Sequence, residues 1–488
     1  MKLFFNDIIH LFSKVKAPSF TGRVRGGSLL LLFLLLLCSC ERQLDIVPKG
    51  KVTLGTVDEL ELLLNQEYQV GDMPADNVGV LCGETMGMFD QVSAVLAQTN
   101  TCKYAYMTFD ETVDRASLTT QDERYNGLYK YVNYMNVIIS GLPGATGDES
   151  RKPSLEAEAR VMRAYMHWLA ACFYARQYDA ATAATDGGIA YVTSTDVTEQ
   201  KQKLTLAEAY ESILQDVSDE VIAQLPADRG DNVVRGDRSW GNAVRAMVLM
   251  QMKRYAEALP YAEEAIRLRP QMFDRATVKA TGTWTQTQSS ENNFLYMSGS
   301  GVRVSPFAVM LSTETTALFE DGDYVRRYDK PDGWSLPYGK SYSGVEGVPM
   351  YMGFGAQCNV YGLTSEQLHL VAAECLIRTG KIPEGLKLID QVRALRVEDA
   401  EPYATTHAGA SEAEAMVLLQ PLKWLEQIAT PFNFIDCKRW NSETAYARTI
   451  TRRIPSQGTY RLAPTSSLWV MPFPLNAVRY NPTLTQNY

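Results

Sequence analysis

The feature that most constrains the fold of this chain is the helical-repeat pattern of residues 239–270. Counted from the first residue of this segment, positions 8, 20 and 27 hold the small residues Ala246, Ala258 and Ala265, and position 32 holds Pro270. Tetratricopeptide (TPR) repeats have this arrangement, because small residues let two antiparallel helices touch and the proline ends the second helix. The segment is therefore expected to form a packed helix pair.

A second segment, residues 366–397, fits the same frame more loosely, with Ala373 and Gly385 at positions 8 and 20. The two segments lie far apart in the sequence rather than in tandem. Two matches among other amphipathic helices predict an all-α fold, a TPR-like helical-repeat scaffold with short strands. We expect its helix pairs around residues 154–270 and 364–397.

Apolar periodicity predicts the remaining helices. They are expected at residues 56–69, at 121–139, from an N-cap at Ser154 onward, and at 205–226. Thr205 and Glu208 form a capping box at the start of the last of these, and Pro226 ends it. A short strand is expected at residues 189–193, after the Gly187–Gly188 pair, and residues 71–108 are interpreted as loop-rich.

Residues 282–362 interrupt the helical pattern. This stretch holds 11 of the 33 glycines and is rich in aromatic residues. A long irregular insertion in a helical body is uncommon and is usually functional. We interpret it as a loop-rich, ligand-binding insertion, although the same rings could instead fold inward and form a small core for the loops.

Within this insertion, the first candidates for ligand contacts are Trp284 and Trp334, because turn-forming and hydrogen-bonding residues flank both. Tyr338 and Tyr342 are second choices, and Tyr296 completes the set. Aromatic rings of this kind stack on the apolar faces of sugars, while nearby polar side chains bind the hydroxyl groups.

The N-terminal region has the order of charges and apolar residues that is typical of a secretory signal. Lysines and arginines precede an apolar run, residues 29–37, that is too short to cross a bilayer. The run ends in Leu37-Cys38-Ser39-Cys40, which looks like a bacterial lipobox in which Cys40 is acylated. We therefore expect residues 1–39 to be a removable signal and residues 40–55 to be an anchor and spacer. The alternative is an ordinary signal peptide with an incidental cysteine.

Charge and cysteine spacing exclude two classes of function. Removal of the signal takes away five basic residues and one acidic residue, so that the net charge falls from −9 to −13. A negative chain without a basic stripe is not expected to bind nucleic acid. The cysteines outside the lipobox contain no CxxC pair and His167 has no histidine at ligand spacing, so neither a metal site nor a cofactor is expected. Cys172 and Cys375 fall in apolar helical patterns, whereas pairing of Cys82 with Cys102 stays open.

Three further segments resemble the SusD/RagB family of outer-membrane nutrient-binding lipoproteins of Bacteroidetes. Residues 471–488 contain Met-Pro-Phe-Pro and then Asn-Pro-Thr-Leu-Thr-Gln-Asn-Tyr, similar to the closing PxP and NPxLxQN pattern of that family. Residues 434–440 are similar to its FxDLKRW segment, and residues 158–165, Glu-Ala-Arg-x-x-Arg-Ala-Tyr, also fit. The chain departs from the family at Thr430, Pro431 and Asn433, where an acidic residue, glycine and arginine are usual.

The resemblance implies that residues 56–488 form one SusD-like domain, with the C-terminal family pattern in residues 421–488. It implies a lipid-anchored, surface-exposed outer-membrane protein that captures oligosaccharide. Its expected partner is a SusC-like TonB-dependent transporter, and the expected process is nutrient uptake in polysaccharide utilisation. The ligand contacts of the family lie in variable loops, so no ligand residue follows from the resemblance. Two alternatives remain within this interpretation, a peptide-binding, RagB-type lid of such a transporter and a periplasmic TPR scaffold lipoprotein.

An enzyme is the main rival to a binding protein. The chain contains no GxSxG, HExxH or P-loop motif, and only His167, His369 and His407 follow the signal to supply a catalytic triad. Pairs of carboxylates are abundant, but none lies in a recognisable glycoside hydrolase motif. We therefore expect no catalytic residues and no turnover.

We predict that Cys40→Ala releases the protein from the membrane fraction. Each buried acyl CH₂ contributes about 0.8 kcal/mol, so a cysteine with two or three chains holds a protein durably on a bilayer. Fractionation of cells that express the wild type, Cys40→Ala and the control Cys38→Ala measures the effect. Detergent-dependent association that persists in Cys40→Ala contradicts the prediction.

Overall fold

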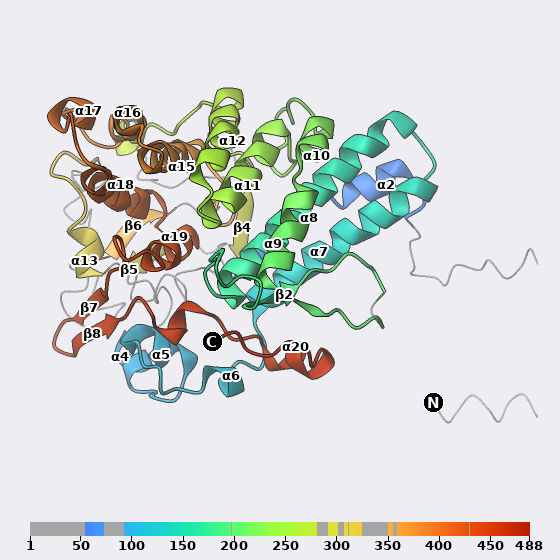
Figure 1. Cartoon of the computed structure of the whole chain (residues 1–488), viewed down its shortest axis with the longest axis horizontal. Coiled ribbons are helices and arrows are strands. Elements are labelled where there is room, and N and C mark those ends of the chain that lie inside the picture. Colours follow the sequence, from blue (N-terminus) through green and yellow to red (C-terminus); the bar gives the residue numbers. More distant parts are fainter. Residues whose placement is uncertain are drawn as a thin grey trace, which may run out of the picture. The chain divides into compact units, whose positions relative to one another are not determined.

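The computed structural model describes residues 54–72, 92–196, 198–280, 291–300, 307–310, 312–324, 350–354, 359–428 and 430–488. Helices dominate this part of the chain (Figure 1). The longer helices are α7 (Glu123–Gly141), α8 (Lys152–Tyr174), α9 (Leu206–Asp216), α11 (Arg238–Gln251), α12 (Tyr255–Leu268), α15 (Ser365–Arg378), α16 (Ile382–Arg393), α18 (Glu412–Glu426) and α19 (Phe432–Asn441). The shorter ones are α2 (Val57–Leu62), α4 (Val92–Leu96), α5 (Cys102–Thr108), α6 (Arg115–Leu118), α10 (Asp219–Gln224), α13 (Thr313–Thr316), α17 (Tyr403–Thr406) and α20 (Leu475–Tyr480). The predicted all-α, TPR-like class is confirmed.

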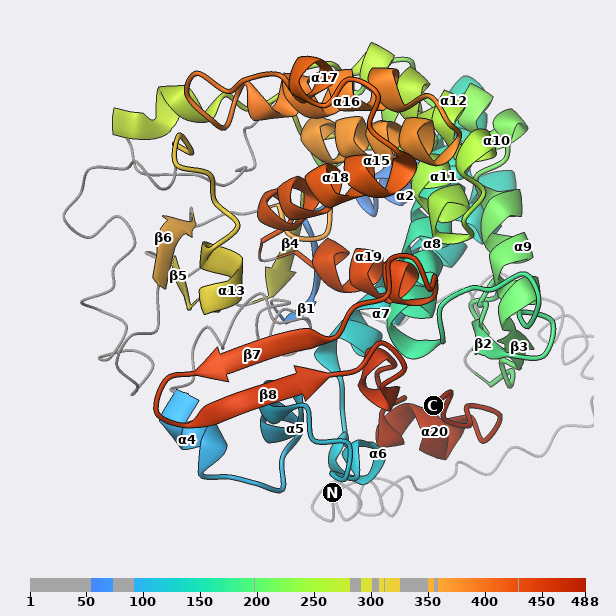
Figure 2. The same cartoon turned by 60° about the vertical axis from the view of Figure 1, so that its left-hand side comes forward.

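The two TPR-like segments form helix pairs, α11 with α12 and α15 with α16. α12 also packs on α15, so the pairs are neighbours in space although they are far apart in sequence (Figure 2). Gly385 shows why the repeat needs a small residue at position 20. A Cβ atom there would lie 2.7 Å from Cγ1 of Ile377 and 2.9 Å from the carbonyl oxygen of Ala373.

α8 is the central helix of the body, and it packs against α7, α9, α10 and α11. The sequence pattern indicated an amphipathic helix with one apolar stripe, but nearly every side chain from Ala157 to Tyr174 is buried. The charged groups within it are paired. The guanidinium of Arg163 binds both carboxylate oxygens of Asp216 on α9 at 2.7 and 2.9 Å, and Glu158 accepts two hydrogen bonds from Arg235 at 2.6 and 2.7 Å.

The strands of the described residues form four two-stranded sheets. β1 (Tyr68–Asp72) pairs in parallel with β4 (Met297–Ser300), and the other three pairs are antiparallel. Those pairs are β2 (Gly187–Ala190) with β3 (Lys203–Thr205), β5 (Phe307–Met310) with β6 (Met350–Phe354), and β7 (Ile450–Ile454) with β8 (Gly458–Leu462).

Several predicted boundaries were wrong. The helix expected at residues 56–69 ends at Leu62, because the following residues turn and enter β1. Ser154 does not cap α8, which begins at Lys152 with Pro153 in its first turn, where proline favours a helix start. The helix expected at 205–226 is divided into α9 and α10 at Val217, although the capping box of Thr205 and Glu208 is confirmed.

The loop-rich interpretation of residues 71–108 is corrected for its described part, which contains α4 and α5. The strand expected at 189–193 lies two residues earlier, at Gly187–Ala190. In the insertion 282–362, the described residues include β4, β5, β6 and α13. Three of its rings, Tyr296, Phe319 and Tyr361, are buried, as the inward-folding alternative required.

The C-terminal end of α8 is capped by residues from the far end of the chain. The side chain of Lys438 donates to the carbonyl oxygen of Cys172 at 2.8 Å and also to that of Ala175. The backbone N–H of Met471 donates to Phe173, and Asn487 donates to Tyr174 at 2.8 Å. The last carbonyl groups of a helix have no partner within it, so these bonds satisfy four acceptors in a buried place.

A buried charge cluster joins α15, α18 and α19. Glu374 accepts hydrogen bonds from Arg439 at 2.7 and 3.0 Å, from Lys423 at 3.0 Å and from the indole N–H of Trp440 at 2.8 Å. The two cations hold the pKa of Glu374 well below its usual range in spite of burial, which alone raises it. Asp436 pairs with both cations, so the cluster is balanced.

We predict that Asn487→Ala lowers the free energy of unfolding by about 2–4 kcal/mol. Its amide donates to the carbonyl oxygens of Tyr174 and Gly188 at 2.8 and 2.9 Å, and each buried acceptor left without a donor costs about 1–3 kcal/mol. Asn232→Ala, which changes an exposed asparagine, serves as the control and is expected to stay within about 0.5 kcal/mol. Urea unfolding of both variants tests this, and equal effects would contradict the role of Asn487.

Candidate functional site

The structure places only one of the ligand-binding candidates from the sequence. Tyr296 is fully buried, and its backbone N–H donates to the carbonyl oxygen of Val233 at 2.7 Å. Its ring is not offered to a ligand, so Tyr296 is left out of the proposals below. Trp284, Trp334, Tyr338 and Tyr342 lie outside the described residues, as does Cys40.

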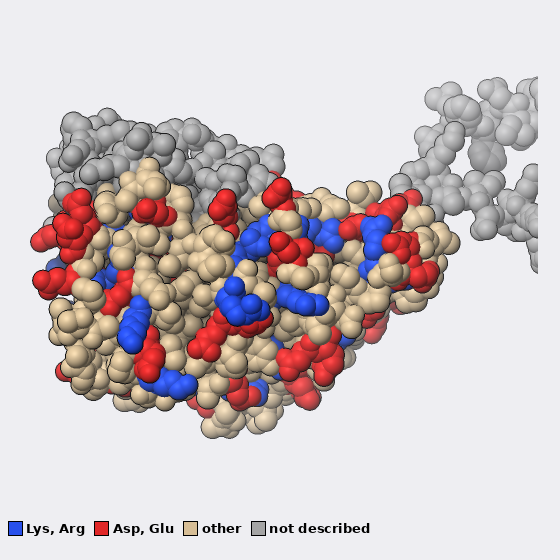
Figure 3. All heavy atoms as spheres, turned by 90° about the horizontal axis from the view of Figure 1, so that it is seen from above, with Lys and Arg blue, Asp and Glu red and all other residues tan. Residues whose placement is uncertain are grey.

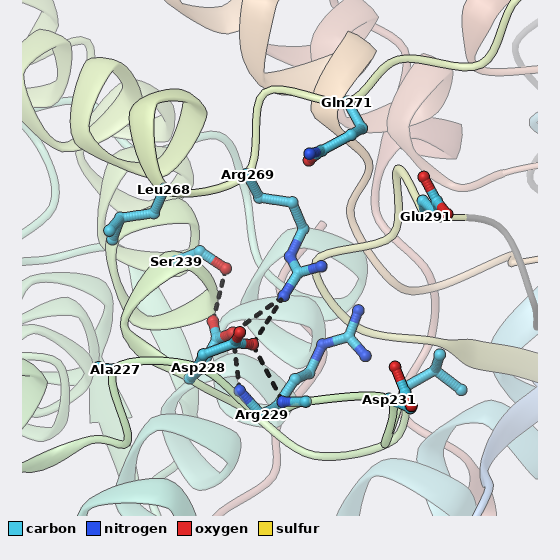
Figure 4. A pocket seen from close by; sticks show the side chains of 12 residues that line it. Ala227, Asp228, Arg229, Asp231, Ser239, Leu268, Arg269, Gln271 and Glu291 are labelled. Carbon is cyan, nitrogen blue, oxygen red and sulfur yellow. Dashed lines mark hydrogen bonds and ion pairs between the residues drawn. The ribbon is translucent and has the colours of Figure 1, made fainter.

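The described residues enclose a cavity of about 670 Å³ beside α11 and α12 (Figure 4). Its walls come from the loop that precedes α11, from the end of α12 and from the entry to the insertion. The lining residues are Ala227, Asp228, Arg229, Gly230, Asp231, Val233, Asp237, Ser239, Leu268, Arg269, Gln271 and Glu291. A volume of this size is typical of small-molecule sites.

Local sequence chemistry shapes the floor of this pocket. Asp237 is the N-cap of α11 and accepts a hydrogen bond from the backbone N–H of Trp240 at 3.1 Å. Asp228 accepts from the N–H of Gly230 at 3.0 Å, and Gly230 adopts a φ of +63°, which glycine tolerates without strain. These contacts fix the conformation of the loop of residues 227–237 between α10 and α11.

Two arginines project into the pocket from opposite walls (Figure 4). Arg269 forms an ion pair with Asp237 at 3.1 Å and a longer one with Asp228 at 3.7 Å. Arg229 donates through Nη2 to the carbonyl oxygen of Asn293 at 2.7 Å, but its Nε and Nη1 are buried without a partner. Burial, followed by repulsion from Arg269, lowers the pKa of Arg229 to about 10.

Asp228, Asp231 and Glu291 stand exposed at the rim. The pocket therefore offers donors at its base and acceptors at its mouth, and none of its described lining residues is aromatic. Such a lining suits a ligand rich in hydroxyl groups. This site was not predicted from the sequence, in which the helix was expected to end at Pro226 and residues 227–237 were assigned no role. The dense turn-forming and charged run Asp-Arg-Gly-Asp-Asn at 228–232 was the available signal.

Three smaller cavities lie near the C-terminal residues, with volumes of about 510, 470 and 440 Å³. In the largest of them the ammonium of Lys203 donates to the carbonyl oxygen of Thr485 at 2.8 Å and to Oδ1 of Asn487 at 3.0 Å. These bonds fasten the last residues of the chain to β3. We therefore assign this cavity a structural role.

The ring of His167 is used for structure. His167 is buried, with Nδ1 2.9 Å from the carbonyl oxygen of Arg163, and Nε2 accepts the N–H of Val192 at 3.0 Å. Burial and the nearby Arg163 lower its pKa to about 3, so the ring is neutral. Across the described part of the chain, no cluster of three or more His, Cys, Asp or Glu residues is arranged to hold a metal.

Cys172 and Cys375 are buried free thiols, and burial raises the pKa of each to about 12, so both act as small apolar residues. Cys102 is also a free thiol, whereas Cys82 lies outside the described residues. No helix that the structure describes has the length and apolarity needed to span a bilayer.

The charged side chains on one face of the molecule are mixed in sign (Figure 3). The described residues include exposed pairs of opposite charge, such as Arg254 with Glu257 and Arg267 with Glu264. On the face shown in Figure 3, lysines and arginines lie among aspartates and glutamates. That face gives no basic surface for a nucleic acid backbone.

The packed helix pairs define the class of the fold, that of TPR-like helical-repeat proteins. Comparison with known proteins is more specific. Residues 57–239 match the family model SusD-like_3, described as "Starch-binding associating with outer membrane". A comparison with curated proteins finds no match.

Solved structures extend the likeness to most of the chain. A putative sugar binding protein from Bacteroides vulgatus aligns with a TM-score of 0.65 and 14% identity, covering 90% of this chain and 99% of its own. A SusD superfamily protein from Bacteroides thetaiotaomicron aligns with a TM-score of 0.64 and 17% identity, and the alignment covers 89% of this chain and 100% of that protein. A SusD-like carbohydrate binding protein from Bacteroides vulgatus aligns with a TM-score of 0.64 and 14% identity, and the alignment covers 88% of this chain and 97% of that protein. The chain therefore has the fold of these SusD superfamily structures, and residues 57–239 resemble the SusD-like_3 family.

Proposed function

We propose that this SusD-like chain is a lipid-anchored outer-membrane protein that binds oligosaccharide and delivers it to a SusC-like TonB-dependent transporter. The observation that carries the proposal is the match of residues 57–239 to a family described as starch-binding and associated with the outer membrane. The SusD-like fold over about nine-tenths of the chain supports it. The lipobox at Cys40 supports the anchor.

The helix pairs and the remaining segments of the chain have different roles, because their side chains make different contacts. In each helix pair the apolar faces pack against one another, and Ala246, Ala258 and Ala265 are fully buried at the contact. The pairs therefore serve as a rigid platform that has few rings left to bind a sugar. Recognition falls to polar pockets at the margins and to aromatic residues of the insertion.

Binding without turnover is the second part of the proposal. The cavity beside α11 and α12 contains carboxylates, but Asp237 is committed to capping α11 and to an ion pair with Arg269. A pair of catalytic carboxylates needs one acid kept protonated by an apolar or negatively charged setting. We therefore expect the protein to hold glycan and leave its glycosidic bonds intact.

We predict that Trp284→Ala and Trp334→Ala each weaken oligosaccharide binding about tenfold or more and leave the melting temperature nearly unchanged. A stacked ring at a binding hot spot contributes roughly 2 kcal/mol, and tenfold corresponds to about 1.4 kcal/mol. Isothermal titration calorimetry gives the affinity, and a thermal melt of each variant reports its stability.

The control for both variants is Tyr480→Ala, which removes a ring that is 81% exposed on α20 and should change neither quantity. If the tryptophan variants instead lose stability and keep their affinity, the two rings form loop core. The ligand would then be sought at the pocket beside α11 and α12, or in residues 71–108.

A further inference from the structure

The positive charge at the bottom of the pocket beside α11 and α12 is only partly balanced by ion pairs. The guanidinium groups of Arg229 and Arg269 both line the pocket, and Arg269 forms ion pairs with Asp237 at 3.1 Å and with Asp228 at 3.7 Å. Within the described part of the chain, Arg229 has no ion pair with any carboxylate. Its only hydrogen bond from the guanidinium is the one to the carbonyl oxygen of Asn293.

Arg229 therefore carries two buried N–H donors, Nε and Nη1, that have no acceptor. Arg269 has a third, at its Nε. Buried donors without a partner are uncommon in folded proteins, and a water, an ion or a ligand can supply the acceptor at such a place. An oxyanion suits such a place, because a guanidinium donates to two of its oxygens at once and loses little energy to its own dehydration.

Other features of the pocket limit what kind of anion fits. Asp228, Asp231 and Glu291 are exposed at the rim, and their charges disfavour a polyanion that would run across the mouth. The same carboxylates accept hydrogen bonds from hydroxyl groups. The volume of about 670 Å³ has room for a sugar unit, which a free inorganic ion does not fill.

We propose that this pocket binds an acidic sugar unit of the glycan, with its oxyanion held by Arg229 and Arg269 and its hydroxyl groups held at the rim. The inference rests on the proposed glycan-binding function and gives it a substrate class. The oxyanion is either the carboxylate of a uronic acid or a sulfate ester, which present the same chemistry to a guanidinium pair. Neutral glucose polymers lack it.

The test is calorimetric titration of the full-length protein in detergent with three probes: trigalacturonate, galactose 6-sulfate and neutral galactotriose. We expect at least one acidic probe to bind about tenfold or more tightly than the neutral one. Arg229→Gln should abolish that preference, so that its affinities for the acidic and neutral probes become equal. Arg229→Lys keeps the positive charge but loses the paired N–H donors of the guanidinium, so it should retain part of the preference.

Arg238→Gln is the matched control. Arg238 lies at the start of α11, close to the pocket in sequence, but its guanidinium donates to the carbonyl oxygens of Leu225 and Ala223. A thermal melt of each variant establishes that it is folded. The control should keep the preference for acidic probes, and loss of that preference in both variants would contradict a specific role for Arg229.

Two outcomes separate this inference from the proposed function. Equal affinity for acidic and neutral probes, or an acidic preference that survives Arg229→Gln, overturns the inference and leaves glycan binding intact. If no saccharide binds at all, the glycan proposal fails. Inorganic sulfate then decides about the pocket, since a rise in melting temperature that depends on Arg229 supports an oxyanion site, and no rise overturns it.

Discussion

The C-terminal end of α8 is the point on which the rest of the structure depends. This helix lies at the centre of the body and is buried on nearly all sides, so water cannot satisfy its last carbonyl groups. Lys438, Met471 and Asn487 supply the missing donors from segments that follow α8 by more than 250 residues in the chain. The core helix is therefore complete only when the end of the chain has folded onto it.

This arrangement gives a physical reason for the three segments that resemble the SusD/RagB family. Glu158 and Arg163 place their charges in buried pairs with Arg235 and Asp216, which fix α8 to its neighbours. The segment of α19 contributes Lys438 to the cap and Arg439 to the pair with Glu374. The closing residues contribute Asn487 and, through Gln486, a pair of hydrogen bonds to the backbone of Phe473. All three segments contribute buried contacts that hold the scaffold together.

The sequence predicted the elements whose cause is local. Small residues at repeat positions predicted the pairs α11–α12 and α15–α16, and Gly385 fits there because a Cβ atom would collide with the facing helix. The capping box of Thr205 and Glu208 likewise depends on residues three positions apart. Elements with a distant cause were missed. β1 exists because Tyr68 pairs with Met297, and no pattern within residues 56–72 reveals that partner.

The same distinction applies to the site. Residues 228–232 showed a turn in the sequence, but the pocket arises only because Arg269 from the end of α12 and Glu291 from the insertion reach the same place. The unpartnered donors of Arg229 depend on that long-range packing and have no signature in sequence. Burial of one aromatic ring was also not predicted from the sequence. Tyr296 was expected to contact a ligand, and it instead lies in the core.

The central proposal is that this chain, which has a SusD-like fold, holds glycan without cleaving it. Affinity electrophoresis of the purified full-length protein through gels that contain neutral, uronate-rich and sulfated polysaccharides, followed by an assay for new reducing ends, tests the claim most directly. The account predicts retarded migration in at least one polysaccharide and no new reducing ends. Unretarded migration in every polysaccharide, or the reproducible release of reducing ends, would contradict it.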